Sequence, residues 1–141
     1  VSDFTMIAKN REKSKNIIIF EGMTNMLSMI EILKAQGRDL EEYSFVSLNS
    51  TSNTERLIPQ LQRADKSKYT NIICLLDGDP SGDEATQKIL HVVPEAKDLR
   101  GYFNIGRGEK QYNDLNDYLV KRIQQAQKEE QERTKSRGRR I

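Results

Sequence analysis

Residues 71–82 have the sequence NIICLLDGDPSG, and this stretch decides the fold. Its first six residues are apolar apart from Asn71, and a short run that is apolar on both faces is typical of a buried strand in a parallel sheet. The run ends in two aspartates, a proline and two glycines, which suit a tight loop at the rim of such a sheet. Residues 83–92 then show the apolar spacing of a helix. A buried strand, a loop and a helix in this order form half of a βαβ unit.

The same alternation of strands and helices runs through the rest of the chain. Short apolar or alternating runs predict strands at residues 16–20, 43–48 and, more weakly, 99–105. Helical spacing predicts helices at residues 23–36, around Leu57 and Leu61, and from Asn113 or Asp114 onward. We therefore predict an α/β fold of Rossmann-like type, with a small parallel sheet of about four strands flanked by helices.

Composition divides the chain into three parts. Residues 1–15 are polar and of mixed charge, and we treat them as an N-terminal lead-in. Residues 16–123 contain the predicted strands and helices and form one domain. Residues 124–141 contain almost no apolar residues and end in a basic stretch, which predicts a fraying helix followed by a disordered tail. This tail either follows a phosphate backbone or is a solvated end or a linker.

The overall composition excludes several classes of protein. The 141 residues carry a net charge of +2 with a single cysteine and a single histidine, so an internal disulfide and a Cys/His zinc site are both excluded. No apolar run approaches the ~18–20 residues that a membrane span needs, and we expect a cytoplasmic protein in a bacterial cell. The chain begins at Val1 without a methionine, so we expect it to be one part of a longer protein.

Three acidic residues directly follow predicted strands. Glu21 follows the strand at 16–20, and Asp77 and Asp79 follow the strand at 71–76. Ligands of open α/β sheets bind at the carboxyl ends of the strands, and close carboxylates repel each other unless a cation lies between them. Carboxylate oxygens suit Mg²⁺ or Mn²⁺, so we predict a divalent-metal site. The alternative is that Asp77 and Asp79 are only turn and helix-cap residues.

These residues resemble a known family. Residues 20–22 (FEG), followed about 55 residues later by residues 76–82 (LDGDPSG), resemble the motifs of the Toprim domain. That domain occurs in bacterial-type DNA primases, type IA and type II topoisomerases, OLD-family nucleases and RecR proteins. The resemblance covers roughly residues 15–122 and is strongest to the Toprim domains of bacterial-type and mobile-element primases.

The resemblance implies a role for each acid. Glu21 matches the residue that is a general acid/base in topoisomerases and part of the metal site in primases. Asp77 and Asp79 match the metal-binding pair. Asp114 matches an acid that follows the last strand in primases, which makes it a fourth expected metal ligand. Two positions depart from the pattern: Asn116 stands where many primases have a second aspartate, and Asn25 stands where the first helix often has one, a change that we expect to affect support of the site.

Basic residues near the predicted fourth strand suit the phosphates of a substrate. Arg107, Lys110 and Arg100 lie in or beside this strand and the glycine-flanked turn after it, although a plain turn is an equally good interpretation. Three functions remain open. The first is the catalytic module of a DNA primase-like protein, a nucleotidyltransferase that makes RNA primers in DNA replication on a DNA template with NTPs, together with other domains of the same chain. The second is a metal-dependent nuclease, and the third is a non-catalytic DNA-binding or assembly module.

Overall fold

The computed structural model describes residues 3–64 and 67–138. Its strands are β1 (Thr5–Ala8), β2 (Asn16–Phe20), β3 (Tyr43–Ser47), β4 (Asn71–Cys74) and β5 (Ala96–Asp98). Its helices are α1 (Met23–Ala35), α2 (Thr54–Arg63), α3 (Pro80–Val92) and α4 (Leu115–Gly138). The predicted strands at 16–20, 43–48 and 71–76 and the helices between them are therefore confirmed to within a few residues.

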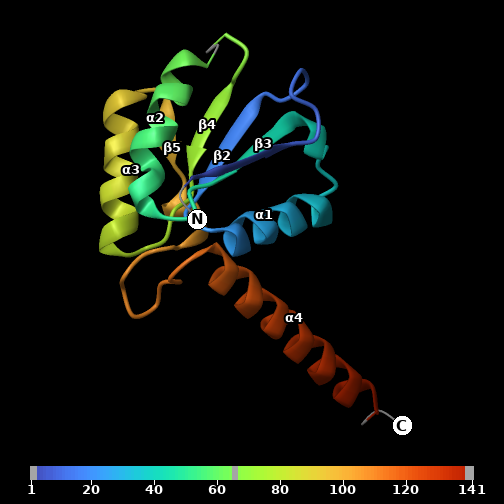
Figure 1. The fold of residues 1–141 in the computed structure, drawn as a ribbon. Helices are drawn as coiled ribbons and strands as arrows, with labels where there is room; N and C mark the ends of the chain where they lie inside the picture. Colours follow the sequence, from blue (N-terminus) through green and yellow to red (C-terminus); the bar gives the residue numbers. More distant parts are fainter. Residues whose placement is uncertain (1–2, 65–66, 139–141) are drawn as a thin grey trace.

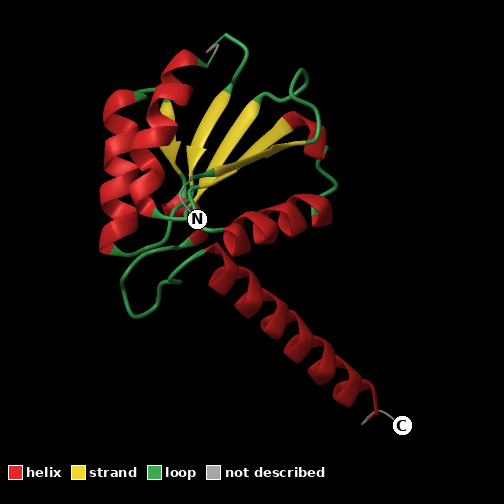
Figure 2. Cartoon of the chain, viewed as in Figure 1, coloured by secondary structure: helices red, strands yellow, loops and turns green. Residues whose placement is uncertain are grey.

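The five strands form one mixed sheet with the order β1-β3-β2-β4-β5 (Figures 1 and 2). Strands β3, β2, β4 and β5 run parallel to one another, whereas β1 pairs antiparallel with β3. The α/β class and the mostly parallel sheet are thus confirmed, and β2 and β4 are neighbours at its centre. Because these two strands are parallel, the residues that follow them emerge at the same edge of the sheet.

The sheet separates two hydrophobic cores. Alternate residues of β2 point to opposite faces, so Ile17 and Ile19 pack with residues of α2 and α3, whereas Ile18 and Phe20 pack with residues of α1 and the start of α4. These four side chains are at most 3% exposed, and full burial of one such side chain contributes about 1.5–3 kcal/mol. The centre of the sheet is therefore a rigid base for the loops at its carboxyl edge.

Two predictions about the strands are wrong. Residues 99–105 do not form the fourth parallel strand, because the chain leaves the sheet after β5 and makes a 3₁₀ turn at Arg100–Phe103. The Asp98 carboxylate accepts a hydrogen bond from the backbone N–H of Arg100, which turns the chain at this point. Phe103 and Ile105 are buried while Tyr102 is exposed. The apolar residues that suggested a strand are therefore residues of the 3₁₀ turn and the segment after it that pack into the core. The segment treated as a lead-in contributes β1, a fifth strand that pairs with β3.

The helix predicted to continue beyond residue 124 is present, but it extends as α4 to Gly138, so the expectation of a disordered tail is wrong up to that residue. Figure 1 shows α4 extending away from the sheet, and residues 120–137 are exposed. Strong helix formers and local pairs such as Gln125–Glu129 and Glu130–Arg133 support a helix in this position. Residues 139–141 of the predicted tail lie outside the described residues.

Within the described part of the chain, none of the helices combines the length and hydrophobicity needed to cross a bilayer.

Candidate metal centre

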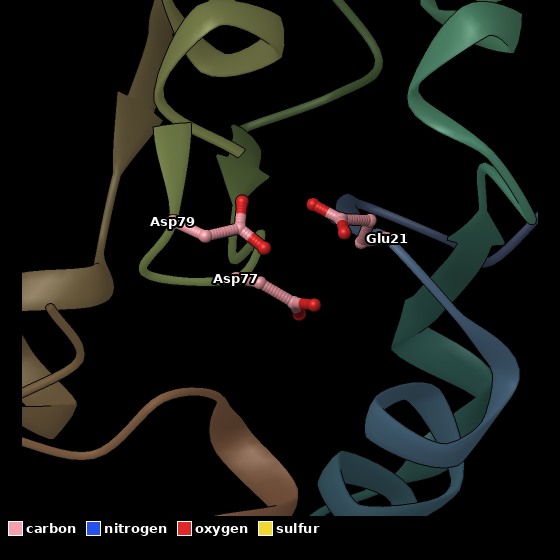
Figure 3. A group of neighbouring side chains, drawn as sticks. All are labelled: Glu21, Asp77 and Asp79. Carbon is pink, nitrogen blue, oxygen red and sulfur yellow. The ribbon is translucent and has the colours of Figure 1, made fainter. Parts of the chain in front are cut away.

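The carboxyl ends of β2 and β4 bring three acids together. Glu21 is the first residue after β2, and Asp77 and Asp79 lie in the loop between β4 and α3. Figure 3 shows the Glu21 side chain facing the two aspartates across the gap between the strands. One carboxylate oxygen from each residue lies within 4.8 Å of the others. The structure therefore joins residues that are more than fifty positions apart in the sequence.

Asp79 has a structural role as well as a place in this cluster. It is the N-cap of α3, and its Oδ1 accepts a 2.7 Å hydrogen bond from the backbone N–H of Gly82. The helix-cap interpretation is thus confirmed for Asp79, but it does not exclude the metal-site interpretation. The cap holds the side chain in place, and Pro80 at the first helical position suits a helix that begins immediately after it.

The electrostatics of the cluster favour a cation. Burial raises the pKa of the Glu21 carboxyl to about 8, and the neighbouring carboxylates of Asp77 and Asp79 add to this shift. Burial also raises the pKa of Asp77, and the charges of Asp114 and Asp79 contribute to that shift. The part of the chain that the structure describes offers no hydrogen-bond partner to the buried Oε1 atom of Glu21. An orphan carboxylate oxygen in an all-oxygen donor set fits Mg²⁺ or Mn²⁺.

The Asp77 loop is held from several sides. The side-chain amide of Asn25 donates a 2.9 Å hydrogen bond to Asp77 Oδ1, and Arg100 Nη1 donates to the Asp77 carbonyl at 3.2 Å. The N–H of Gly78 donates to the carbonyl of Asn113 at 2.7 Å. These contacts come from α1, the 3₁₀ turn and the segment before α4, so the position of Asp77 depends on three separate parts of the fold.

The basic residues predicted to bind phosphate have different environments. The Arg100 side chain is only 12% exposed and forms ion pairs with Asp83 at 2.6 Å and Asp98 at 2.9 Å. Arg107 is 65% exposed and pairs with Asp83 at 3.0 Å. Lys110 is exposed, and its carbonyl accepts a hydrogen bond from the side chain of Asn104. The guanidinium of Arg100 thus braces β5, α3 and the Asp77 loop, whereas Arg107 and Lys110 face solvent.

The sequence did not single out Asp83 and Asp98, which hold Arg100. The signal for Asp98 was available, since an aspartate two residues before Arg100 suits a turn in which its carboxylate accepts the backbone N–H. The pairing of Asp83 with Arg100 had no signal of this kind, because it joins two different elements that only the fold brings together.

Asp114 lies beside the cluster without joining the compact group of three. Its Oδ1 accepts a 2.8 Å hydrogen bond from the backbone N–H of Asp117, so it caps the start of α4. Among the described residues, the one group of three or more acids with oxygens within 4.8 Å of one another consists of Glu21, Asp77 and Asp79. Asp114 is nevertheless close enough to Asp77 for its charge to raise the pKa of that residue. Its role as a fourth ligand stays a prediction.

Comparison with known proteins agrees with the geometry. The family model described as Toprim-like matches residues 18–119, most of the chain. The chain belongs to the Toprim-like family. This match includes Glu21, Asp77, Asp79 and Asp114, so the site lies within the Toprim-like domain. No curated protein matches the chain.

One solved structure of a primase shares this fold. The primase fragment of the bacteriophage T7 primase-helicase protein matches with a TM-score of 0.56 and 18% sequence identity over 78% of this chain and 41% of that chain. A second match is the structure of bacteriophage T7 lagging-strand DNA polymerase interacting with primase domains of two gp4 subunits bound to an RNA/DNA hybrid and dTTP. It has a TM-score of 0.48 and 22% identity, and covers 62% of this chain and 42% of that one. The Toprim-like domain thus spans less than half of either matched chain.

Proposed function

We propose that this domain is the metal-binding catalytic module of a DNA primase-like protein, which makes RNA primers by metal-dependent nucleotidyl transfer. The observation that carries the proposal is the convergence of Glu21, Asp77 and Asp79 at the carboxyl edge of the sheet, with their oxygens within 4.8 Å. Membership of the Toprim-like family and the fold shared with the T7 primase fragment support it. Template binding and the other steps of priming require further parts of a longer protein.

The proposed site assigns separate tasks to the residues of this chain. Glu21, Asp77 and Asp79 would hold the divalent cation. Asp114, which lies beside these three residues, would be a fourth ligand. When bound, such a cation neutralises the charge of a nucleoside triphosphate and lowers the pKa of an attacking hydroxyl. Because burial raises the pKa of Glu21 to about 8, cation binding at neutral pH requires that carboxyl group to release its proton. Glu21 is also the residue of the three best suited to exchange a proton near neutral pH.

The proposed partners are a DNA template, NTPs and other domains of the same protein, acting in the bacterial cytoplasm. Arg107 and Lys110 are exposed, and Arg107 lines a pocket together with Gly78 of the loop that carries Asp77 and Asp79. They are therefore the stronger candidates for contact with phosphates, although Arg107 also pairs with Asp83 at the surface. Arg100 is already paired with Asp83 and Asp98, and a direct contact with phosphate would require it to give up one of these partners.

Calorimetric titration with Mn²⁺ tests the metal site on this domain. We expect the double variant Asp77→Asn, Asp79→Asn to lose at least tenfold in affinity, because two of the three acidic ligands become neutral. Glu31→Gln is the matched control, since Glu31 is an exposed acid of α1 whose pair with Lys34 is loose at 3.8 Å. Equal Mn²⁺ affinity of the double variant and the wild type would remove the proposed site.

The reaction itself is tested on the longer protein that contains this domain. Single-stranded DNA is incubated with Mg²⁺, with and without NTPs, and the products are separated by size. New RNA that requires NTPs supports primer synthesis, whereas metal-dependent cleavage of DNA without incorporation supports a nuclease. Full biological activity of the Glu21→Gln variant would instead support a non-catalytic module.

A further inference from the structure

Asn25 is a buried polar side chain in the first turn of α1, four residues after Glu21. It is 5% exposed, and a buried amide is stable only when its donors and acceptor find partners. Asn25 finds them on two elements that are distant in sequence, the loop that carries Asp77 and the start of α4. The Asn25 side chain therefore connects the loop that carries Asp77 to the start of α4.

The two hydrogen bonds fix the orientation of the Asn25 amide. Its Oδ1 accepts a 3.1 Å hydrogen bond from the backbone N–H of Asn116, and its Nδ2 donates to Asp77 Oδ1 at 2.9 Å. A backbone N–H can only donate, and an ionised carboxylate can only accept. The opposite amide orientation would place two donors together and two acceptors together, so the NH₂ group must face Asp77.

A second contact between the same helices reinforces this arrangement. Ser28 lies one turn after Asn25 on α1, and its hydroxyl donates to Oδ1 of Asn116 at 2.9 Å. Asn116 is thus held through its side chain by Ser28 and through its backbone by Asn25. Of these α1 residues, only Asn25 also contacts a member of the acidic cluster. The chain can therefore be altered at Ser28 without touching Asp77, which provides a matched control.

We propose that Asn25 is a positioning residue that orients the Asp77 carboxylate toward the metal site by donating a hydrogen bond to its Oδ1 atom. This inference rests on the proposed metal site. With Oδ1 held by a neutral donor, Asp77 cannot rotate freely, and the donor adds no further negative charge beside three acids. An asparagine at this position thus keeps the position of Asp77 without adding to the repulsion. Hydrogen-bond partners of metal ligands typically contribute 10–100-fold to metal affinity.

The test compares Mn²⁺ binding by the wild type and the variants Asn25→Leu, Asn25→Asp and Ser28→Ala. Calorimetry gives the dissociation constant, thermal unfolding without metal gives the stability, and the electron paramagnetic resonance spectrum at saturating Mn²⁺ reports the ligand geometry. We expect Asn25→Leu to bind at least tenfold more weakly with an altered spectrum. Ser28→Ala should lower the unfolding temperature but keep the affinity within twofold and the spectrum unchanged.

Asn25→Asp keeps the acceptor for the Asn116 N–H but replaces the donor to Asp77 with a second carboxylate oxygen and a negative charge. It therefore tests the proposal even if Asn25→Leu does not fold. We expect it also to bind Mn²⁺ at least tenfold more weakly at pH 7. Equal or tighter binding by folded Asn25→Asp, or affinity losses in Asn25→Leu and Ser28→Ala that follow the loss of stability, would overturn the proposal. A wild type that does not bind Mn²⁺ would overturn the proposed function itself, whereas normal wild-type binding with unaffected variants overturns only the role of Asn25.

Discussion

Glu21 is the residue in which stability and function conflict most clearly. Its carboxyl group lies beside Asp77 and Asp79, and one of its oxygens is buried without a partner in the described part of the chain. Burial and the neighbouring charges raise its pKa to about 8. Without a cation the folded domain therefore favours a protonated Glu21, and the ionised form that would bind a cation carries a cost in stability.

The pH dependence of stability follows from this shift. Between about pH 4.5 and pH 8 the folded protein keeps a proton on Glu21 that the unfolded chain has released, so the free energy of unfolding falls as the pH rises. Allowing for solvent screening of a partly exposed group, we expect a loss of about 2 kcal/mol between pH 5 and pH 8.5 in metal-free buffer. Urea unfolding at several pH values measures it.

The variant Glu21→Gln is the control for this prediction, because it keeps the size of the side chain and removes its titration. Its unfolding free energy should vary less across the same range and exceed that of the wild type at pH 8.5. A wild type whose stability is constant between pH 5 and pH 8.5 would contradict the predicted shift. Saturating Mn²⁺ should reverse the wild-type trend, since the ionised form then gains a partner.

At the scale of elements, the loop between β4 and α3 is constrained by its glycines. A Cβ atom on Gly82 would lie 2.1 Å from the carbonyl oxygen of Asp77, and one on Gly78 would lie 2.7 Å from the backbone of Gly106. The first turn of α3 can therefore lie against the Asp77 backbone only because residue 82 has no side chain. The carbonyl of Asp77 also accepts a hydrogen bond from Arg100 Nη1 at 3.2 Å.

The substitution Gly82→Ala should displace this loop. The obstructing atom belongs to the backbone and cannot rotate away, so we expect a loss of about 2 kcal/mol in unfolding free energy together with weaker Mn²⁺ binding. Gly101→Ala is the matched control, because nothing lies within 4 Å of the added Cβ and no such loss should follow. Urea unfolding and calorimetry measure both effects, and a fully stable Gly82→Ala domain with normal affinity would show that the close approach is not required.

At the scale of the whole molecule, α4 joins two different environments. Leu115 at its start is 1% exposed and belongs to the core between the sheet and α1. Residues 120–137 are exposed, and the helix extends away from the sheet (Figure 1). From residue 124 onward the helix is polar apart from Ala126. A helix that is polar on all sides gains little from packing and is stabilised mainly by its local pairs. The domain should thus depend on the first turns of α4 and hardly at all on the rest.

Truncation tests this division of α4. Deleting residues 127–141 should change the free energy of unfolding by no more than about 0.5 kcal/mol, because the described residues removed are exposed. Leu115→Ala, in contrast, should lose about 2–5 kcal/mol by leaving a cavity in the core. Urea unfolding of the two proteins measures the difference, and a truncation as damaging as Leu115→Ala would mean that the distal part of α4 packs against the domain.

The sequence by itself determined the centre of this protein. Runs of β-branched residues predict β2 and β4 because they are buried on both faces, and three acids directly after such strands indicate a cation site at one edge of the sheet. These signals are local, since they depend only on periodicity and on the order of neighbouring residues. The motifs around Glu21 and Asp77 also pointed to the Toprim-like family, which the match over residues 18–119 confirms.

The tertiary structure alone decided the features that depend on distant partners. Strand β1 is only four residues long and lies in a segment of mixed charge, and only pairing with β3 makes it a strand. Arg100 has the sequence context of a phosphate ligand, yet Asp83 and Asp98 surround it in the fold. The hydrogen bond from Asn25 to Asp77 spans 52 positions. Local pattern cannot specify such contacts, because they form only when packing of the two cores brings separate elements to the same edge of the sheet.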